Sequence, residues 1–180
     1  MKKILFVIPS NDFRDEEYFV SRKKFELKNF EIKVASNKLG VALGADGGEV
    51  KVDSEIKDID IIKFDALVFI GGPGCLKYLN NQESYKLIIE ANYSNKIIGA
   101  ICISPVILAE SGILKNKKAT VWTSSLDKSA AKFLEEKGAF YQNQNVVIDN
   151  NIITADGPFS AEKFSEAITT ACGLPKSTKI

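Results

Sequence analysis

Cys102 is the residue whose surroundings most strongly indicate chemistry. The five residues before it, 97–101, can form a buried strand. Ser104 and Pro105 after it suit the N-cap and the first position of a helix. The thiol would therefore stand on a sharp strand-to-helix turn, a nucleophile elbow. The free N–H groups and positive dipole end of the helix favour the thiolate there, so we expect a pKa below the about 8.5 of a free cysteine.

Two other loops could supply groups to such a nucleophile. Gly71 and Gly72 follow a predicted buried strand at 66–70, and a backbone N–H there, beside that of Ile103, could form a two-donor oxyanion site. The loop after the first predicted strand carries Arg14, Asp15, Glu16 and Glu17, and so brings charged groups to the same edge. Each feature also has a structural explanation: a small core cysteine, an ordinary strand-to-helix turn, and a carboxylate that complements a helix dipole.

An alternation of strands and helices must position these loops. We expect strands at 3–8, 30–35, 66–70, 97–101 and 119–122, helices at 16–27, 76–79, 83–92, 129–137 and 160–171 and another starting at Pro105, and hairpins within 41–53 and 145–155. This order is typical of an open parallel sheet with helices on both faces, in which function gathers at the carboxyl ends of the strands. The three candidate loops would meet at that edge.

Composition narrows the class of protein. The 180 residues are 45% hydrophobic, which predicts one domain over residues 1–180. The net charge is +1 and the charges are scattered, so we expect neither a nucleic-acid partner nor a membrane partner. No run reaches the about 18 apolar residues that span a bilayer, and the start runs into a strand instead of a signal peptide. The three cysteines are widely spaced and form no disulfide or zinc pattern, so we expect a reducing, cytoplasmic location.

Three of these motifs together resemble the ThiJ/PfpI superfamily, which includes intracellular proteases, a deglycase and chaperone, and glyoxalases that need no cofactor. The resemblance rests on Ala100-Ile101-Cys102 followed by Ser104-Pro105, on Gly71-Gly72, and on the run Asp12-Phe13-Arg14-Asp15-Glu16-Glu17. It implies a flavodoxin-like three-layer α/β sandwich, with a mostly parallel sheet and helices on both faces.

The resemblance also implies roles for individual residues. Cys102 would be the nucleophile, Glu17 its buried acidic partner, and the backbone N–H groups of Gly72 and Ile103 the oxyanion donors. No cofactor and no metal would be needed. A homodimer is implied as well, and we assign its contacts to the glycine-rich segment 41–53 and to the first helix.

The chain departs from the family in one respect, because it contains no histidine. Protease-like members carry a histidine directly after the cysteine, where this chain has Ile103. Other members supply one from the loop after the next strand, where this chain has Trp122, Thr123 and Ser124. Amide hydrolysis needs a group that protonates the departing amine, and imidazole suits that task near neutral pH. We therefore expect neither peptidase nor glutamine amidotransferase activity.

A cysteine and a carboxylic acid can still act together on small reactive carbonyl compounds. The main hypothesis is a cofactor-free glyoxalase- or deglycase-like enzyme in which the thiolate adds to an aldehyde and Glu17 moves a proton. One alternative is a cysteine-oxidation sensor or redox-linked chaperone without turnover. Another is a non-catalytic relic in which Trp122 fills the place of an imidazole.

Three residues are further candidates for the pocket wall: Trp122, Gly71 and Cys75. For Cys75, which comes just after the glycine-rich turn, an inward-packing core position is the favoured interpretation. Cys172, beside apolar residues of the last helix, is expected to be a core residue.

Overall fold

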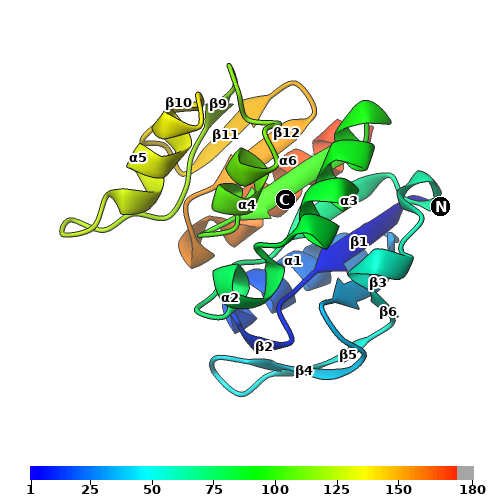
Figure 1. Cartoon of the computed structure of the whole chain (residues 1–180). Coiled ribbons are helices and arrows are strands. Elements are labelled where there is room, and N and C mark those ends of the chain that lie inside the picture. Colours follow the sequence, from blue (N-terminus) through cyan, green and yellow to red (C-terminus); the bar gives the residue numbers. More distant parts are fainter. Residues whose placement is uncertain (174–180) are drawn as a thin grey trace, which may run out of the picture.

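A central sheet of seven strands organises the computed structural model, which describes residues 1–173. The strands are β1 (Lys3–Val7), β3 (Glu31–Ser36), β6 (Ser54–Glu55), β7 (Ala66–Phe69), β8 (Ile97–Ile101), β11 (Val146–Asp149) and β12 (Ile152–Ala155). They lie in the order β11-β12-β8-β7-β1-β3-β6 (Figure 1). All neighbours are parallel except the hairpin β11–β12. This is the open, mostly parallel sheet that the alternating pattern predicts, in the flavodoxin-like arrangement that the family resemblance implies.

Helices cover both faces of the sheet. On one face lie α1 (Asp15–Leu27) and α6 (Ala161–Ala171), which pack against each other; on the other lie α2 (Cys75–Leu79), α3 (Gln82–Tyr93), α4 (Pro105–Glu110) and α5 (Ser129–Glu136) (Figure 1). Side chains alternate along a strand, so β1 serves two cores. Leu5 and Val7 pack with α3 and α4, whereas Ile4 and Phe6 pack with α1 and α6. Burial on both faces explains why these strands are continuous apolar runs.

The hairpin expected within 41–53 is present and belongs to a separate small sheet. Its strands β4 (Gly40–Gly44) and β5 (Glu49–Val52) are antiparallel, and β4 also pairs with β2 (Asn11–Phe13). The Asp15 carboxylate accepts hydrogen bonds from the backbone N–H groups of Asp46, at 2.8 Å, and Gly48, at 2.6 Å. The turn of the hairpin is thereby attached to the first turn of α1.

The strand predicted at 119–122 is shorter than expected. Only β9 (Lys118–Ala119) forms, and it pairs with β10 (Phe140–Tyr141) outside the central sheet. The next N–H groups have other acceptors: Thr120 donates to the hydroxyl of Thr154 and Trp122 donates to the carbonyl of Cys102. These N–H groups are not free to pair with β10, so the strand ends at Ala119.

Ser104 does not act as the N-cap that its place before Pro105 predicts. Its backbone is already helical, with φ −64° and ψ −23°, and its side chain caps no N–H group. The hydroxyl accepts a hydrogen bond from the Ile101 N–H at 2.9 Å and lies within bonding distance of the carbonyls of Ile101 and Phe69. Ser104 therefore ties together the carboxyl ends of β7 and β8.

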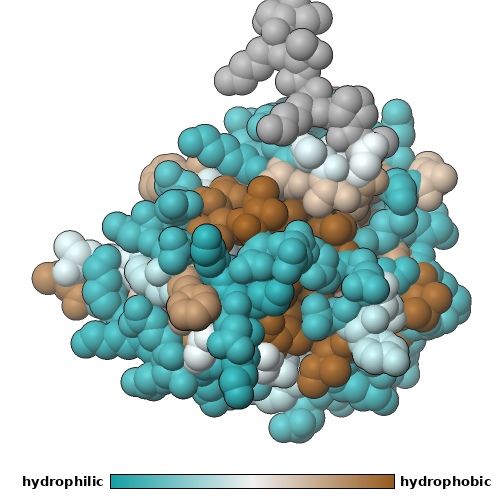
Figure 2. All heavy atoms as spheres, turned by 90° about the horizontal axis from the view of Figure 1, so that it is seen from above, coloured by the Kyte–Doolittle hydropathy of each residue, from teal (hydrophilic) through white to brown (hydrophobic). Residues whose placement is uncertain are grey.

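Short 3₁₀ turns at Ile56–Asp58, Ile61–Lys63 and Pro158–Ser160 complete the connections. None of the helices within residues 1–173 combines the length and the apolar composition that crossing a membrane requires. Seen from above the view of Figure 1, charged and polar side chains cover most of the surface, and apolar side chains show between them (Figure 2).

Candidate active site

Cys102 lies on the turn between β8 and α4, with its backbone in the left-handed region at φ +65°. Few residues with a side chain adopt this conformation, so neighbouring structure must hold it. The Cys102 N–H donates to the Ala155 carbonyl at 2.9 Å, and the Cys102 carbonyl accepts from the Trp122 N–H at 2.8 Å. The end of β12 and the loop after β9 therefore hold the turn on both sides. The cysteine is 8% exposed at the carboxyl edge of the sheet.

Glu17 lies in the first turn of α1, and its side chain is fully buried. Its Oε2 accepts a hydrogen bond from the Gly71 N–H at 2.9 Å, and the Cys102 thiol lies within hydrogen-bonding reach of the carboxyl group. Burial raises the pKa of Glu17 to about 7, against opposing effects from Cys102, the Gly71 N–H and Arg14. A carboxyl group with such a pKa can both accept and donate a proton at neutral pH.

Gly71 separates the carboxyl group from the cysteine. A β-carbon at Gly71 would lie 2.7 Å from the β-carbon of Cys102 and 3.0 Å from Oε2 of Glu17. Only glycine allows both groups to approach this point. Gly71 therefore lies between the two reactive side chains. Contrary to expectation, it does not line the adjoining pocket.

The environment of Cys102 acts on its thiol in two opposing ways. Burial raises the pKa of the thiol, and the charge of the neighbouring Glu17 carboxylate raises it further. The backbone N–H groups of Ile103 and Gly72 are within hydrogen-bonding reach of the sulfur and lower the pKa by a smaller amount. The expected lowering is therefore wrong in direction. Helix α4 has six residues, and its amino end does not outweigh desolvation next to a carboxylate.

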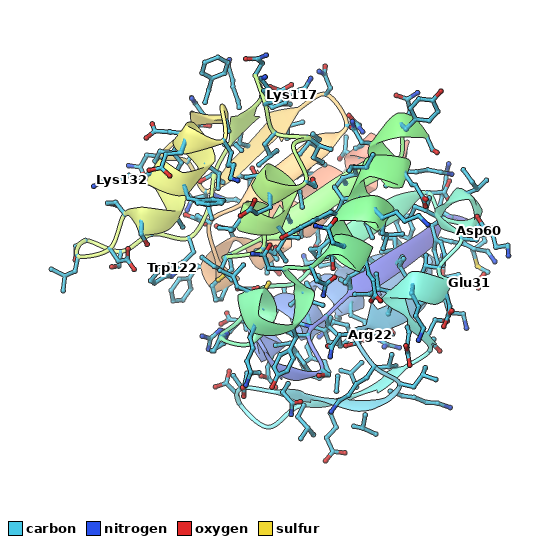
Figure 3. All side chains as sticks on the ribbon, in the orientation of Figure 1. Arg22, Glu31, Asp60, Lys117, Trp122 and Lys132 are labelled. Carbon is cyan, nitrogen blue, oxygen red and sulfur yellow. The ribbon has the colours of Figure 1, made fainter. Side chains whose placement is uncertain are left out.

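A pocket of about 320 Å³ leads to the sulfur. Its wall is formed by Arg14, Gly72, Pro73, Leu76, Cys102, Ile103 and Trp122. Trp122 is 39% exposed and projects from the loop after β9 (Figure 3). Larger hollows of about 670 Å³, between α1 and the strands β3 and β5, and about 600 Å³, beside the amino terminus, contain no cysteine. We therefore place the chemistry in the smaller pocket.

The other two cysteines lie in the core. Cys75 is the first residue of α2 and is fully buried. It does not line the pocket, and burial raises the pKa of its thiol. Its candidacy as a pocket residue is therefore wrong, and the inward-packing interpretation is correct. Cys172 is 8% exposed in the core beside α6, and burial raises its pKa to about 11. All three cysteines are free.

Sequence reasoning placed two further residues in the loop before Glu17 but assigned them no role. Arg14 contributes a charged group to the pocket wall, and Asp15 attaches the hairpin turn. The available signal was their place in the same acidic run as Glu17, directly after a short strand. Within residues 1–173, no three histidine, cysteine, aspartate or glutamate side chains gather closely enough to hold a metal ion.

Comparison with known proteins places this geometry in a family. The model of the DJ-1/PfpI family matches residues 2–171. An uncharacterized protein of Methanocaldococcus jannaschii is 39% identical over 170 residues, covering 94% of this chain and 82% of that protein. A putative cysteine protease of Bacillus subtilis is 31% identical (92% and 95% covered), and a glutathione-independent glyoxalase of Caenorhabditis elegans is 28% identical (98% and 92% covered).

Solved structures show the same relationship. The crystal structure of a ThiJ/PfpI domain protein from Brachyspira murdochii superimposes with a TM-score of 0.89 at 32% identity. The match covers 95% of this chain and 96% of the other.

Proposed function

Because the chain belongs to the DJ-1/PfpI family, we propose that it is a cytoplasmic, cofactor-free enzyme that uses Cys102 to convert small 2-oxoaldehydes into 2-hydroxy acids. One observation carries the proposal: Cys102 and Glu17 approach the same point beside Gly71, at the end of a small pocket. The pKa of Glu17, about 7, suits a group that must take up and return a proton in each cycle.

The first step is addition of the sulfur to the aldehyde. The Glu17 carboxylate accepts the thiol proton as the sulfur attacks, which is how a thiol of raised pKa can act at neutral pH. The carbon–sulfur bond forms and the carbonyl electron pair moves to oxygen. The N–H groups of Gly72 and Ile103 hold this oxyanion, and Glu17 returns its proton to give a hemithioacetal.

The second step moves a hydrogen between the two carbons of the substrate. Glu17, ionised again, removes the hydrogen of the former aldehyde carbon as a proton, which leaves an enediolate. The proton on the first oxygen passes to the second oxygen, and Glu17 returns its proton to the neighbouring carbon. The product is a thioester of a 2-hydroxy acid on Cys102. Water then hydrolyses the thioester, so the net reaction adds one water molecule and needs no external oxidant.

A deglycase-type reaction would use the same sulfur on the adduct of such an aldehyde with an amine, whereas peptide hydrolysis acts on an amide. The name of the Bacillus subtilis relative does not carry over, because the chain has no histidine to protonate a leaving amine. We therefore expect no cleavage of casein or of short amide substrates.

The test is turnover of methylglyoxal by the purified protein, with lactate measured as the product. We expect Cys102→Ala to abolish turnover. Cys75→Ala serves as the matched control and should retain it, because Cys75 lies outside the pocket. No lactate from the wild type, or equal lactate from Cys102→Ala, would overturn the proposal.

A second candidate function is oxidation sensing. It is favoured by the position of Glu17, whose protonated carboxyl could donate a hydrogen bond to a sulfinate oxygen on Cys102. Peroxide-dependent addition of oxygen to Cys102 without methylglyoxal turnover would support the sensor. Turnover that depends on Cys102 supports the enzyme.

A further inference from the structure

Arg14 brings a positive charge into the Cys102 pocket. Proline, leucine, isoleucine and tryptophan side chains make up much of the remaining wall, and among the wall residues Arg14 alone carries a cationic side chain. The Arg14 side chain is 34% exposed and forms part of the pocket wall, so it is partly shielded from water. A cation in these surroundings is screened less than one on the open surface.

Much of the hydrogen-bonding capacity of Arg14 is unused. Its Nε is buried and has no hydrogen-bond partner within residues 1–173. Its Nη1 lies 3.7 Å from a carboxylate oxygen of Asp46, whose side chain is 63% exposed. An ion pair of that length with an exposed partner contributes little. The guanidinium therefore makes no short ion pair within residues 1–173, and an anion that entered the pocket would gain a charge-assisted hydrogen bond from it.

The backbone holds Arg14 beside the reactive residues. The Arg14 N–H donates to the Gly71 carbonyl at 3.0 Å, and the Arg14 carbonyl accepts from the Tyr18 N–H at 3.2 Å. The Arg14 backbone is therefore fixed at the start of α1, next to the Gly71–Gly72 turn. Arg14 and Cys102 line the same pocket of about 320 Å³, so only a small molecule could contact both.

We propose that Arg14 binds an anionic group, a carboxylate or a phosphate, on the small molecules that reach Cys102. If the proposed function holds, the substrates are small 2-oxoaldehydes that carry such a group. The aldehyde part of this statement rests on the proposed function, whereas the anion site rests on the pocket alone.

The anion site can be tested without turnover. Iodoacetate and iodoacetamide alkylate the same sulfur and differ in carrying a carboxylate or a neutral amide. The measurement is the ratio of their rate constants at Cys102, followed by mass spectrometry. The iodoacetamide rate corrects for any change in the reactivity of the sulfur. We expect Arg14→Gln to lower the iodoacetate-to-iodoacetamide ratio about tenfold, and an unchanged ratio would overturn the proposal.

Three further variants separate a specific contact from a general charge effect. Arg14→Lys keeps the charge and should restore part of the ratio. Asp46→Asn removes the competing carboxylate and should raise the ratio; the backbone N–H that binds Asp15 is kept. Lys132→Gln removes one positive charge from the exposed surface of α5 and should leave the ratio unchanged (Figure 3). Equal losses in Lys132→Gln and Arg14→Gln would also overturn the proposal.

Two more measurements identify the anion and separate this proposal from the enzyme hypothesis. Pyruvate and inorganic phosphate are compared, at equal ionic strength, for their ability to protect Cys102 from iodoacetamide. The anion that protects more strongly identifies the preferred group. If neither anion protects Cys102, the proposed site is contradicted. The anionic 2-oxoaldehyde 4,5-dioxopentanoate is compared with methylglyoxal as a substrate. A ratio that depends on Arg14 without turnover of either aldehyde would leave the anion site standing and overturn only the proposed function.

Discussion

At the scale of single residues, the site depends on two groups that share one region of low polarity. Glu17 is fully buried and keeps its proton up to a pKa of about 7, while its ionised form raises the pKa of the Cys102 thiol. Two acidic groups this close lose their protons as a pair, because the first negative charge disfavours the second. The reactivity of the sulfur is therefore controlled by a residue 85 positions earlier in the chain.

Glu17→Gln is expected to separate thiol reactivity from catalysis. Glutamine keeps the size of the side chain and removes its negative charge, so the pKa of Cys102 should fall. A fall of one pKa unit would speed iodoacetamide labelling at pH 8 about tenfold. Methylglyoxal turnover should nevertheless be lost, because an amide cannot accept and return a proton.

Glu16→Gln is the matched control for this variant. Glu16 precedes Glu17 in the chain and is exposed, so the same change of charge should alter both rates by less than about twofold. Slower labelling of Cys102 in Glu17→Gln would show that ionised Glu17 does not raise the thiol pKa.

At the scale of elements, the site is built where three strands end. Strand β8 leads into Cys102, strand β7 leads into the Gly71–Gly72 turn, and strand β2 leads through Arg14 into α1. Gly72, at φ +114°, lies so close to the backbone of residues 12–14 that a side chain there would collide with it. The loops therefore support one another through backbone contacts.

Ser104→Ala is expected to loosen this edge of the sheet. The change leaves the buried Ile101 N–H without its side-chain acceptor and removes the link to the end of β7. We expect the free energy of unfolding to fall by about 1–3 kcal/mol. Urea denaturation measures it, and Ser125→Ala, in an exposed loop, is the control. Equal stability of the two variants would show that the hydroxyl contributes nothing to the fold.

At the scale of the whole molecule, one hydrophobic core lies on each face of the central sheet, and the Cys102 pocket lies at the carboxyl edge between them. The small sheet of β2, β4 and β5 adds a surface beside that edge, attached through Asp15 (Figure 1). Val41 and Leu43 on this hairpin, and Phe19 on α1, are exposed apolar side chains. Such residues are common at contacts between subunits.

We expect the protein to form a homodimer through the hairpin at 41–53 and α1. Sedimentation equilibrium should give twice the 19.8 kDa of one chain. Val41→Asp should shift the mass toward that of the single chain, because it places a charge on the apolar contact. Ile148→Asp changes an equally exposed residue on β11, away from the hairpin, and should leave the mass unchanged. A mass of one chain at all concentrations would contradict the prediction.

Local sequence determined the order of the longer helices and strands and the position of the cysteine, but not the short strands β2, β6 and β10. Apolar runs such as 66–70 and 97–101 are continuous because both faces of the sheet are covered, and that pattern is visible without a structure. The turn at Asp149-Asn150-Asn151 was predictable for a similar reason, because these residue types tolerate the positive φ that Asn150 adopts. Both features depend on residues adjacent in the chain.

Tertiary structure alone decided the remaining features, because they join residues far apart in the chain. Arg14 meets the wall of the Cys102 pocket, Asp15 meets the hairpin turn, and Ser104 reaches the end of β7 instead of capping its own helix. The direction of the Cys102 pKa belongs to the same group. A helix amino end is visible in sequence, whereas the burial of a thiol beside a carboxylate is a property of the packed molecule, and here desolvation is the larger effect.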